Sequence, residues 1–206
     1  MRNSLRQTVA CVVVGFALQV CCGVAAQAAD TNAPAGLKIL SRKEWGANLP
    51  VSAMKRHEPK RITIHHTATL QKPEGSLKEK MQALQKFSQN EGNLGNGKAK
   101  PPWPDVPYHY YIAANGEVAE GRDVNFVGDT NTEYDPSGHA LVVLEGNFEE
   151  EQPTEAQLAS LRKMIAWLAV RFHVPPDKIG GHKDFADTLC PGKNLHKLIR
   201  DLAKQR

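Results

Sequence analysis

Two histidines and one cysteine, His65, His182 and Cys190, are the side chains of this sequence with the clearest capacity for metal chemistry. Imidazole nitrogen and thiolate sulfur are the donors that a borderline-soft ion such as Zn²⁺ prefers. Three protein donors leave one tetrahedral position open, which is typical of a catalytic zinc rather than a structural one. A single histidine or cysteine is more often a packed core residue, so the alternative interpretation is three unrelated core side chains.

The cysteine distribution supports treating Cys190 separately. The other three cysteines, Cys11, Cys21 and Cys22, lie within the first 22 residues. This stretch has two arginines, an apolar run over 9–20 and the A-x-A pattern of residues 26–28, which together predict a cleavable signal peptide over residues 1–28. After cleavage Cys190 is the single remaining thiol, which excludes an internal disulfide. Cys190 is then a buried thiol, a free reactive thiol or a metal ligand.

The same segment bears on localisation. An apolar run of about 12 residues is shorter than the ~20 needed to span a bilayer, and no later run is long and apolar enough. Cys22 follows an apolar run, as a lipidated cysteine does. The residues before Cys21, Gln19 and Val20, are a poor match to the small residues expected there. We therefore expect a soluble periplasmic or secreted protein rather than a lipoprotein.

Chain length and net charge limit the number of domains and the kinds of partner to expect. Cleavage leaves 206 − 28 = 178 residues, enough for one domain with a sizeable core. The full chain has a net charge of +4, and loss of Arg2 and Arg6 leaves 4 − 2 = +2. No stripe of basic and aromatic residues accompanies this weak charge, so nucleic acid is not an expected partner.

Hydrophobic patterning predicts the elements that must position the three donors. We expect a loose N-terminus over residues 29–40 and one domain over 41–206. Within it, the sequence predicts strands at 61–66, 108–113, 117–120 and 140–144, helices at 77–90, 154–172 and 195–202, and a long surface loop at 92–104. Asn115-Gly116 is a hairpin signal, and Thr154 with Gln157 is a capping-box signal. The predicted fold class is α/β, a single domain with a mixed central sheet covered by helices.

Five segments, in order, carry a resemblance to a known family. They are SRKEWGA (41–47), ITIHHTA (62–68), VPYHYYIAANGEVAEGRD (106–123), VVLEGNF (142–148) and GGHKDFADTLCPG (180–192). On these segments the chain resembles the type 2 zinc-dependent N-acetylmuramoyl-L-alanine amidases, which include the phage lysozyme-type amidases and the peptidoglycan recognition proteins.

The resemblance implies a role for five residues. His65, His182 and Cys190 would bind Zn²⁺, which lowers the pKa of a coordinated water to about 7. Tyr108 matches the family's catalytic tyrosine, and Thr188 would donate to the oxyanion at the scissile carbonyl. The alternative role for Tyr108 is packing on the sheet, as expected for Tyr110 and Tyr111. The alternative for Thr188 is capping of a turn.

The other histidines have simpler interpretations. His66 follows a ligand on its strand and should point to the opposite face, and His109 should likewise alternate away from Tyr108. His139 precedes the central strand, where it lines the site or is structural. His57, His173 and His196 are expected at the surface.

A cytoplasmic branch of the fold has Asp as its third ligand and Glu on the central strand, where this chain has Cys190 and Val143. The resemblance therefore places it with the tyrosine-bearing, cysteine-liganded branch.

The expected function is an exported zinc hydrolase that cleaves the amide between N-acetylmuramic acid and L-alanine in peptidoglycan or its muropeptide fragments. One alternative is a peptidoglycan-binding module without activity. Another is a secreted antibacterial toxin with the same reaction and a neutralising immunity protein.

Overall fold

The computed structural model describes residues 34, 36–94 and 97–205. The predicted signal peptide, residues 1–28, lies outside the described residues. The N-terminal segment was expected to be loose up to residue 40, but its last two residues form a strand. Ile39–Leu40 form strand β1, which pairs in parallel with Val118–Glu120, strand β6. The sheet therefore begins with this edge strand, just before the predicted boundary at residue 41, and Leu37 ahead of it packs against the larger core.

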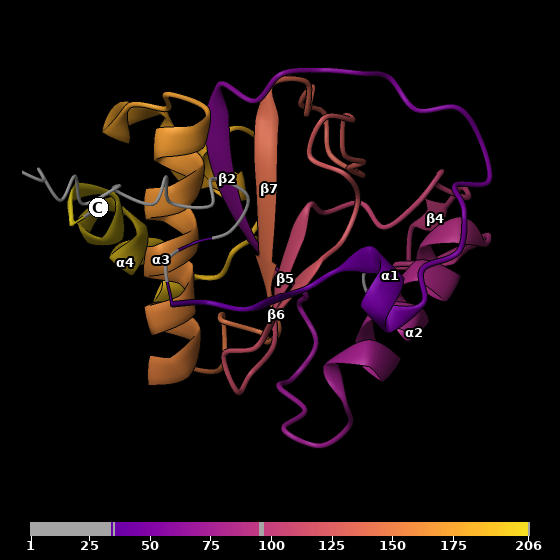
Figure 1. Ribbon diagram of the computed structural model, residues 1–206, viewed down its shortest axis with the longest axis horizontal. Coiled ribbons are helices and arrows are strands. Elements are labelled where there is room, and N and C mark those ends of the chain that lie inside the picture. Colours follow the sequence, from indigo (N-terminus) through magenta and orange to yellow (C-terminus); the bar gives the residue numbers. More distant parts are fainter. Residues whose placement is uncertain (1–33, 35, 95–96, 206) are drawn as a thin grey trace, which may run out of the picture.

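A six-stranded mixed sheet forms the centre of the domain, in the order β1-β6-β5-β7-β2-β8 (Figure 1). The remaining strands are β2 (Arg61–His66), β5 (Tyr110–Ile112), β7 (His139–Leu144) and β8 (Ile179–Gly181). The β5–β6 hairpin is antiparallel, and the other pairings in this sheet are parallel. The predicted mixed sheet is thus confirmed, and β8 is a strand that the sequence analysis did not predict.

The central pair, β2 and β7, fixes which side chains face which layer. The two strands pair over their full length, with Ile62 opposite Ala140 and His65 opposite Val143. Side chains alternate between faces along a strand. Ile62 therefore packs in the larger core, whereas His65 and Val143 project from the opposite face.

Two helices cover the first face (Figure 1). Helix α3 (Glu155–Arg171) begins at the predicted N-cap, where Thr154 and Gln157 form a capping box. Helix α4 (Lys193–Lys204) begins two residues earlier than predicted. Their buried residues pack on the apolar side chains of β2, β5 and β7: Leu161, Met164, Ile165, Leu168, Leu195, Ile199 and Leu202.

The second face carries a smaller core under two helices. Helix α1 (Arg42–Trp45) is a single turn that the sequence analysis did not predict, and α2 (Leu77–Gln89) matches the predicted helix. Trp45 and Met81 are fully buried and pack with Val143 and Tyr111. This core covers part of the face and leaves the end of β2 to the loops that build the site.

The segment predicted as a long surface loop contains a short hairpin, because Gly92–Asn93 (β3) pairs with Ala99–Lys100 (β4). Lys100 anchors its base. The buried Lys100 ammonium donates to the carbonyls of Ser88, Asn90 and Pro101 and lies 4.5 Å from the centre of the Trp103 ring. A cation at the end of α2 also complements the helix dipole. Lys100 thus ties the base of the hairpin to the end of α2.

In the part of the chain that the structure describes, no helix is both long enough and apolar enough to cross a membrane.

Candidate metal and catalytic site

His65 is the second-last residue of β2, so the strand backbone positions its side chain. Its ring is almost fully buried, and its Nδ1 lies 3.6 Å from the sulfur of Cys190. Among the described residues, the other ring nitrogen, Nε2, has no hydrogen-bond partner. An unpaired buried polar atom costs about 1–3 kcal/mol. The described residues therefore leave Nε2 of this histidine unsatisfied.

His182 follows β8 directly and begins the short 3-10 helix η2 (His182–Asp184). The preceding residue must be small, because a Cβ on Gly181 would lie 2.7 Å from both His196 and Pro191. The Asp184 carboxylate accepts a hydrogen bond from the Gly181 amide and so closes this turn. The turn places the His182 ring 4.6 Å from that of His65, centre to centre.

Cys190 arrives on the loop between η2 and α4. Its carbonyl accepts a hydrogen bond from the Lys183 amide, which ties the loop to η2. Its sulfur accepts one from the His66 amide at 3.4 Å. The thiol is thereby held at the end of β2, beside His65.

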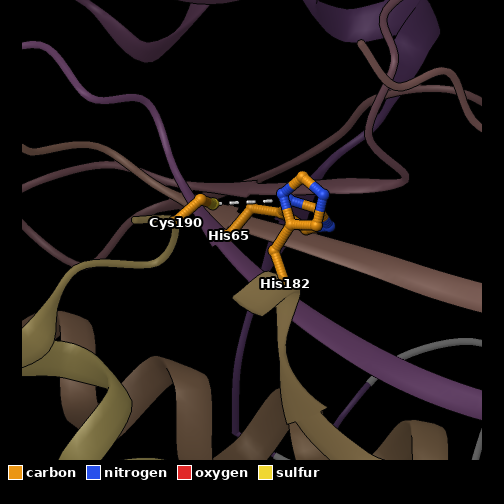
Figure 2. A group of neighbouring side chains, drawn as sticks. All are labelled: His65, His182 and Cys190. Carbon is orange, nitrogen blue, oxygen red and sulfur yellow. Dashed lines mark hydrogen bonds between the residues drawn. The ribbon is translucent and has the colours of Figure 1, made fainter. Parts of the chain in front are cut away.

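The structure brings these three side chains together, and we refer to His65, His182 and Cys190 as the trio (Figure 2). Their donor atoms all lie within 4.8 Å of one another. Two donors of a tetrahedral zinc, with Zn–S of about 2.3 Å and Zn–N of about 2.0–2.1 Å, are separated by about 3.6 Å. The 3.6 Å between the Cys190 sulfur and His65 Nδ1 matches this separation. The chemistry of the donor set and this one separation therefore fit Zn²⁺.

The electrostatics of the trio favour neutral side chains when no cation is beside them. Burial, and then the neighbouring His182, hold the pKa of His65 well below its usual value. Burial lowers the pKa of His182 to about 4 and raises that of the Cys190 thiol to about 12. Unprotonated imidazoles are ready to bind a metal, whereas the thiol must lose its proton when the ion binds.

Tyr108 lies beside the trio, just before β5. Its half-buried ring is 5.2 Å from that of His65, centre to centre. Burial, and then the neighbouring Cys190, raise the pKa of its phenol, so the hydroxyl stays protonated. The Tyr108 carbonyl accepts a hydrogen bond from the Arg122 amide, within the hairpin connection that follows β6. A protonated phenol can donate a hydrogen bond to a group held at the trio.

Thr188 caps a turn, which was the alternative role expected for it. Its hydroxyl oxygen accepts a hydrogen bond from the Cys190 amide at 3.2 Å. This contact leaves the hydroxyl proton free to donate elsewhere.

The neighbouring histidines are structural. His66 points to the face opposite His65, as predicted, and its Nδ1 accepts from the Phe148 amide. The ring of His109 is fully buried and bonded to the Leu141 amide and the Phe126 carbonyl. His57, expected at the surface, is half-buried and accepts from the Gly138 amide. His139 lies on the site face, where its Nδ1 is 2.7 Å from the Thr63 hydroxyl.

Two residues near the trio were not predicted. The Thr132 hydroxyl lies 2.7 Å from Nε2 of His182, and the Tyr134 ring is 5.0 Å from the His182 ring. Both lie in a polar loop before β7 that has no hydrophobic periodicity. No signal in a single sequence identifies them.

Comparison with known proteins agrees with this geometry. The family model Amidase_2, described as N-acetylmuramoyl-L-alanine amidase, matches residues 55–193, which include the trio. The chain is 29% identical to peptidoglycan-recognition protein LB of Drosophila melanogaster, over 77% of this chain and 66% of that protein. It is 28% identical to an N-acetylmuramoyl-L-alanine amidase of Sus scrofa, over 79% of this chain but 27% of that longer protein.

Solved structures show the same fold. Drosophila peptidoglycan recognition protein SD superimposes with a TM-score of 0.67 at 27% identity, over 80% of this chain and 94% of that one. A tyrosine-to-phenylalanine mutant of the Drosophila LB protein, solved in complex with tracheal cytotoxin, gives a TM-score of 0.63 at 27% identity, over 78% and 92%.

The loop that carries Cys190 packs closely against the backbone of residues 148–149 at Gly192, and this close packing can be tested. Gly192 has φ +88, and a Cβ there would collide with the Phe148 backbone and lie 2.6 Å from the Glu149 nitrogen. Gly97 has a similar φ of +79 with no atom within 4 Å of a Cβ. We expect Gly97→Ala to cost about 1–2 kcal/mol in unfolding free energy through backbone strain alone. Gly192→Ala should cost about 1–3 kcal/mol more, through the added overlap. Urea unfolding checks both, and equal losses would contradict the tight fit.

Proposed function

Because this chain belongs to the N-acetylmuramoyl-L-alanine amidase (Amidase_2) family, we propose that it is a zinc-dependent hydrolase of the amide between N-acetylmuramic acid and L-alanine in peptidoglycan. The observation that carries the proposal is the trio, whose two nitrogens and one sulfur gather within 4.8 Å. A three-donor site leaves a position open for a reacting group, as catalytic zinc sites do.

The chief alternative is a module that binds peptidoglycan without cutting it. The proteins named for recognition among its relatives make this alternative specific. Against it, this chain keeps three metal-binding donors, of which Cys190 and His65 lie at the separation expected across a zinc ion, with a protonated tyrosine beside them. A binding surface needs neither feature.

The residues around the trio supply distinct parts of the proposed reaction. When bound, zinc polarises the scissile carbonyl and makes water nucleophilic at neutral pH. Tyr108 donates its phenolic hydrogen bond and so orients the reacting groups, because its raised pKa keeps the proton in place. Thr188 keeps its backbone contact to Cys190 and directs its hydroxyl proton to the carbonyl oxygen as negative charge develops.

The proposed substrate requires the protein to act where peptidoglycan is. The signal-peptide pattern of residues 1–28 supports export, with the mature domain acting in the periplasm or outside the cell. Cys190 is the one described cysteine and is free of a disulfide, which is compatible with an oxidising compartment because no second described thiol is present to pair with it.

The first prediction concerns the metal. The purified mature protein should contain about one zinc per chain, and His65→Ala, His182→Ala and Cys190→Ala should each lose both zinc and activity. Cys190→Asp should retain partial activity, since a carboxylate also binds zinc. His173→Asn is the control, because His173 is exposed and asparagine tolerates its φ of +53. Elemental analysis measures the content. Full activity after exhaustive chelation would overturn the mechanism.

A second prediction isolates the Tyr108 hydroxyl. Tyr108→Phe should keep the fold and the zinc but lower kcat on the order of 10²-fold, the usual effect of removing one positioned electrostatic or proton-transfer group. Tyr110→Phe and Tyr111→Phe are matched controls, since both rings are 5% exposed and lie on β5. If the three variants lose the same activity, Tyr108 has no special role.

The proposed bond is tested by the products. Digestion of purified peptidoglycan should release stem peptides with a new L-alanine amino terminus and leave glycan strands with intact lactyl carboxylates. Mass spectrometry identifies both. New reducing sugar ends, cuts within the stem peptide, or binding of peptidoglycan by the zinc-loaded protein without any release would each contradict the proposed reaction.

A further inference from the structure

The hydroxyl of Thr132, on the loop before β7, lies 2.7 Å from Nε2 of His182. We propose that Thr132 is a positioning residue that sets the ring orientation and the proton position of His182, and thereby the affinity of the trio for zinc. The inference rests on the proposed function, because it concerns the metal that this function requires.

The argument starts from the two nitrogens of an imidazole ring. A neutral histidine carries one N–H and one lone pair, and only the lone pair binds a metal. The hydrogen bond to Thr132 occupies Nε2 of His182. With the proton on Nε2 and directed at the Thr132 oxygen, Nδ1 is left with the lone pair. Metal-bound histidines are commonly held by such an outer hydrogen bond, which fixes both tautomer and orientation.

Thr132 is itself held in place. Its amide donates to the Thr130 hydroxyl oxygen at 3.1 Å, and the two hydroxyl oxygens lie 2.8 Å apart. If His182 donates to Thr132, the Thr132 hydroxyl can send its own proton on to Thr130. Every hydrogen bond in this short chain then has one donor and one acceptor. In this direction the chain leaves Nδ1 of His182 unprotonated, which is the state that binds a metal.

The two histidines of the trio differ in whether an outer hydrogen bond holds the ring. Nε2 of His65 has no hydrogen-bond partner among the described residues, whereas Nε2 of His182 has Thr132. Outer partners of metal-bound histidines typically change metal affinity by about 10–100-fold when removed. The effect of Thr132 should therefore act through His182 and appear in metal binding itself.

The chain offers a matched control in a second threonine–histidine pair. The Thr63 hydroxyl lies 2.7 Å from Nδ1 of His139, on the same face of the sheet. Thr63→Val removes an equivalent hydrogen bond. Because Thr63 is fully buried, this change should disturb the packing of the sheet at least as much as Thr132→Val does. His139 is not a member of the trio. A loss of zinc affinity caused by general loosening of this face should therefore appear in both variants.

The experiment measures the zinc dissociation constant of the full chain by competition with a chromophoric chelator, for the wild type, Thr132→Val, Thr132→Ser and Thr63→Val. We expect Thr132→Val to bind zinc about 10–100-fold more weakly. Thr132→Ser, which keeps the hydroxyl, should bind within about threefold of the wild type, as should Thr63→Val. The absorption spectrum of the Co²⁺-substituted protein should change in Thr132→Val alone, since it reports the arrangement of the donors.

The outcomes separate the two proposals. Wild-type affinity in Thr132→Val, equal weakening in Thr63→Val, or equal weakening in Thr132→Ser overturns the role of the Thr132 hydroxyl and leaves the amidase proposal standing. A wild-type protein that binds no zinc overturns the proposed function, and the role of Thr132 with it. A urea unfolding midpoint for each variant shows that the compared proteins are folded.

Discussion

The parallel pairing of β2 with β7 is the constraint on which the rest of the structure depends. Successive side chains of β2 serve different layers, so Ile64 packs in the larger core while His65 faces the site. A shift of one residue in this register would place His65 among the apolar side chains of α3 and α4. The register is held by apolar burial on both sides of β7, all of whose residues are buried.

The site is the point where three separate segments end beside this pair. The end of β2 supplies His65, the turn after β8 supplies His182, and the loop before α4 supplies Cys190. Short backbone hydrogen bonds, such as that from the Lys183 amide to the Cys190 carbonyl, make the last two segments one unit. The site is thus built on the backbone of the sheet and its turns, and burial then shifts the pKa values of the side chains it holds.

Long periodic elements and the family segments could be predicted from the sequence, and short or purely tertiary features could not. The apolar run of β7 and the capping box of α3 are local signals, and both were found where predicted. Strand β8 contains two glycines in three residues, so it has no local strand signal. It forms because its backbone pairs with that of β2. The contact of Thr132 with His182 spans 50 residues of chain and belongs to no motif. The spacing of the trio likewise came from the fold, although its members were predicted.

The wide separation of the trio along the chain determines when the site can exist during biosynthesis. His65 and Cys190 are 125 residues apart in the chain. A chain made from its N-terminus onward has its histidine strand early but lacks the sulfur until the segment with Cys190 has been made. The donor set therefore cannot assemble on a chain that stops before Cys190. Synthesis of that segment is the event that makes metal capture possible, so a product interrupted before Cys190 contains no preformed site.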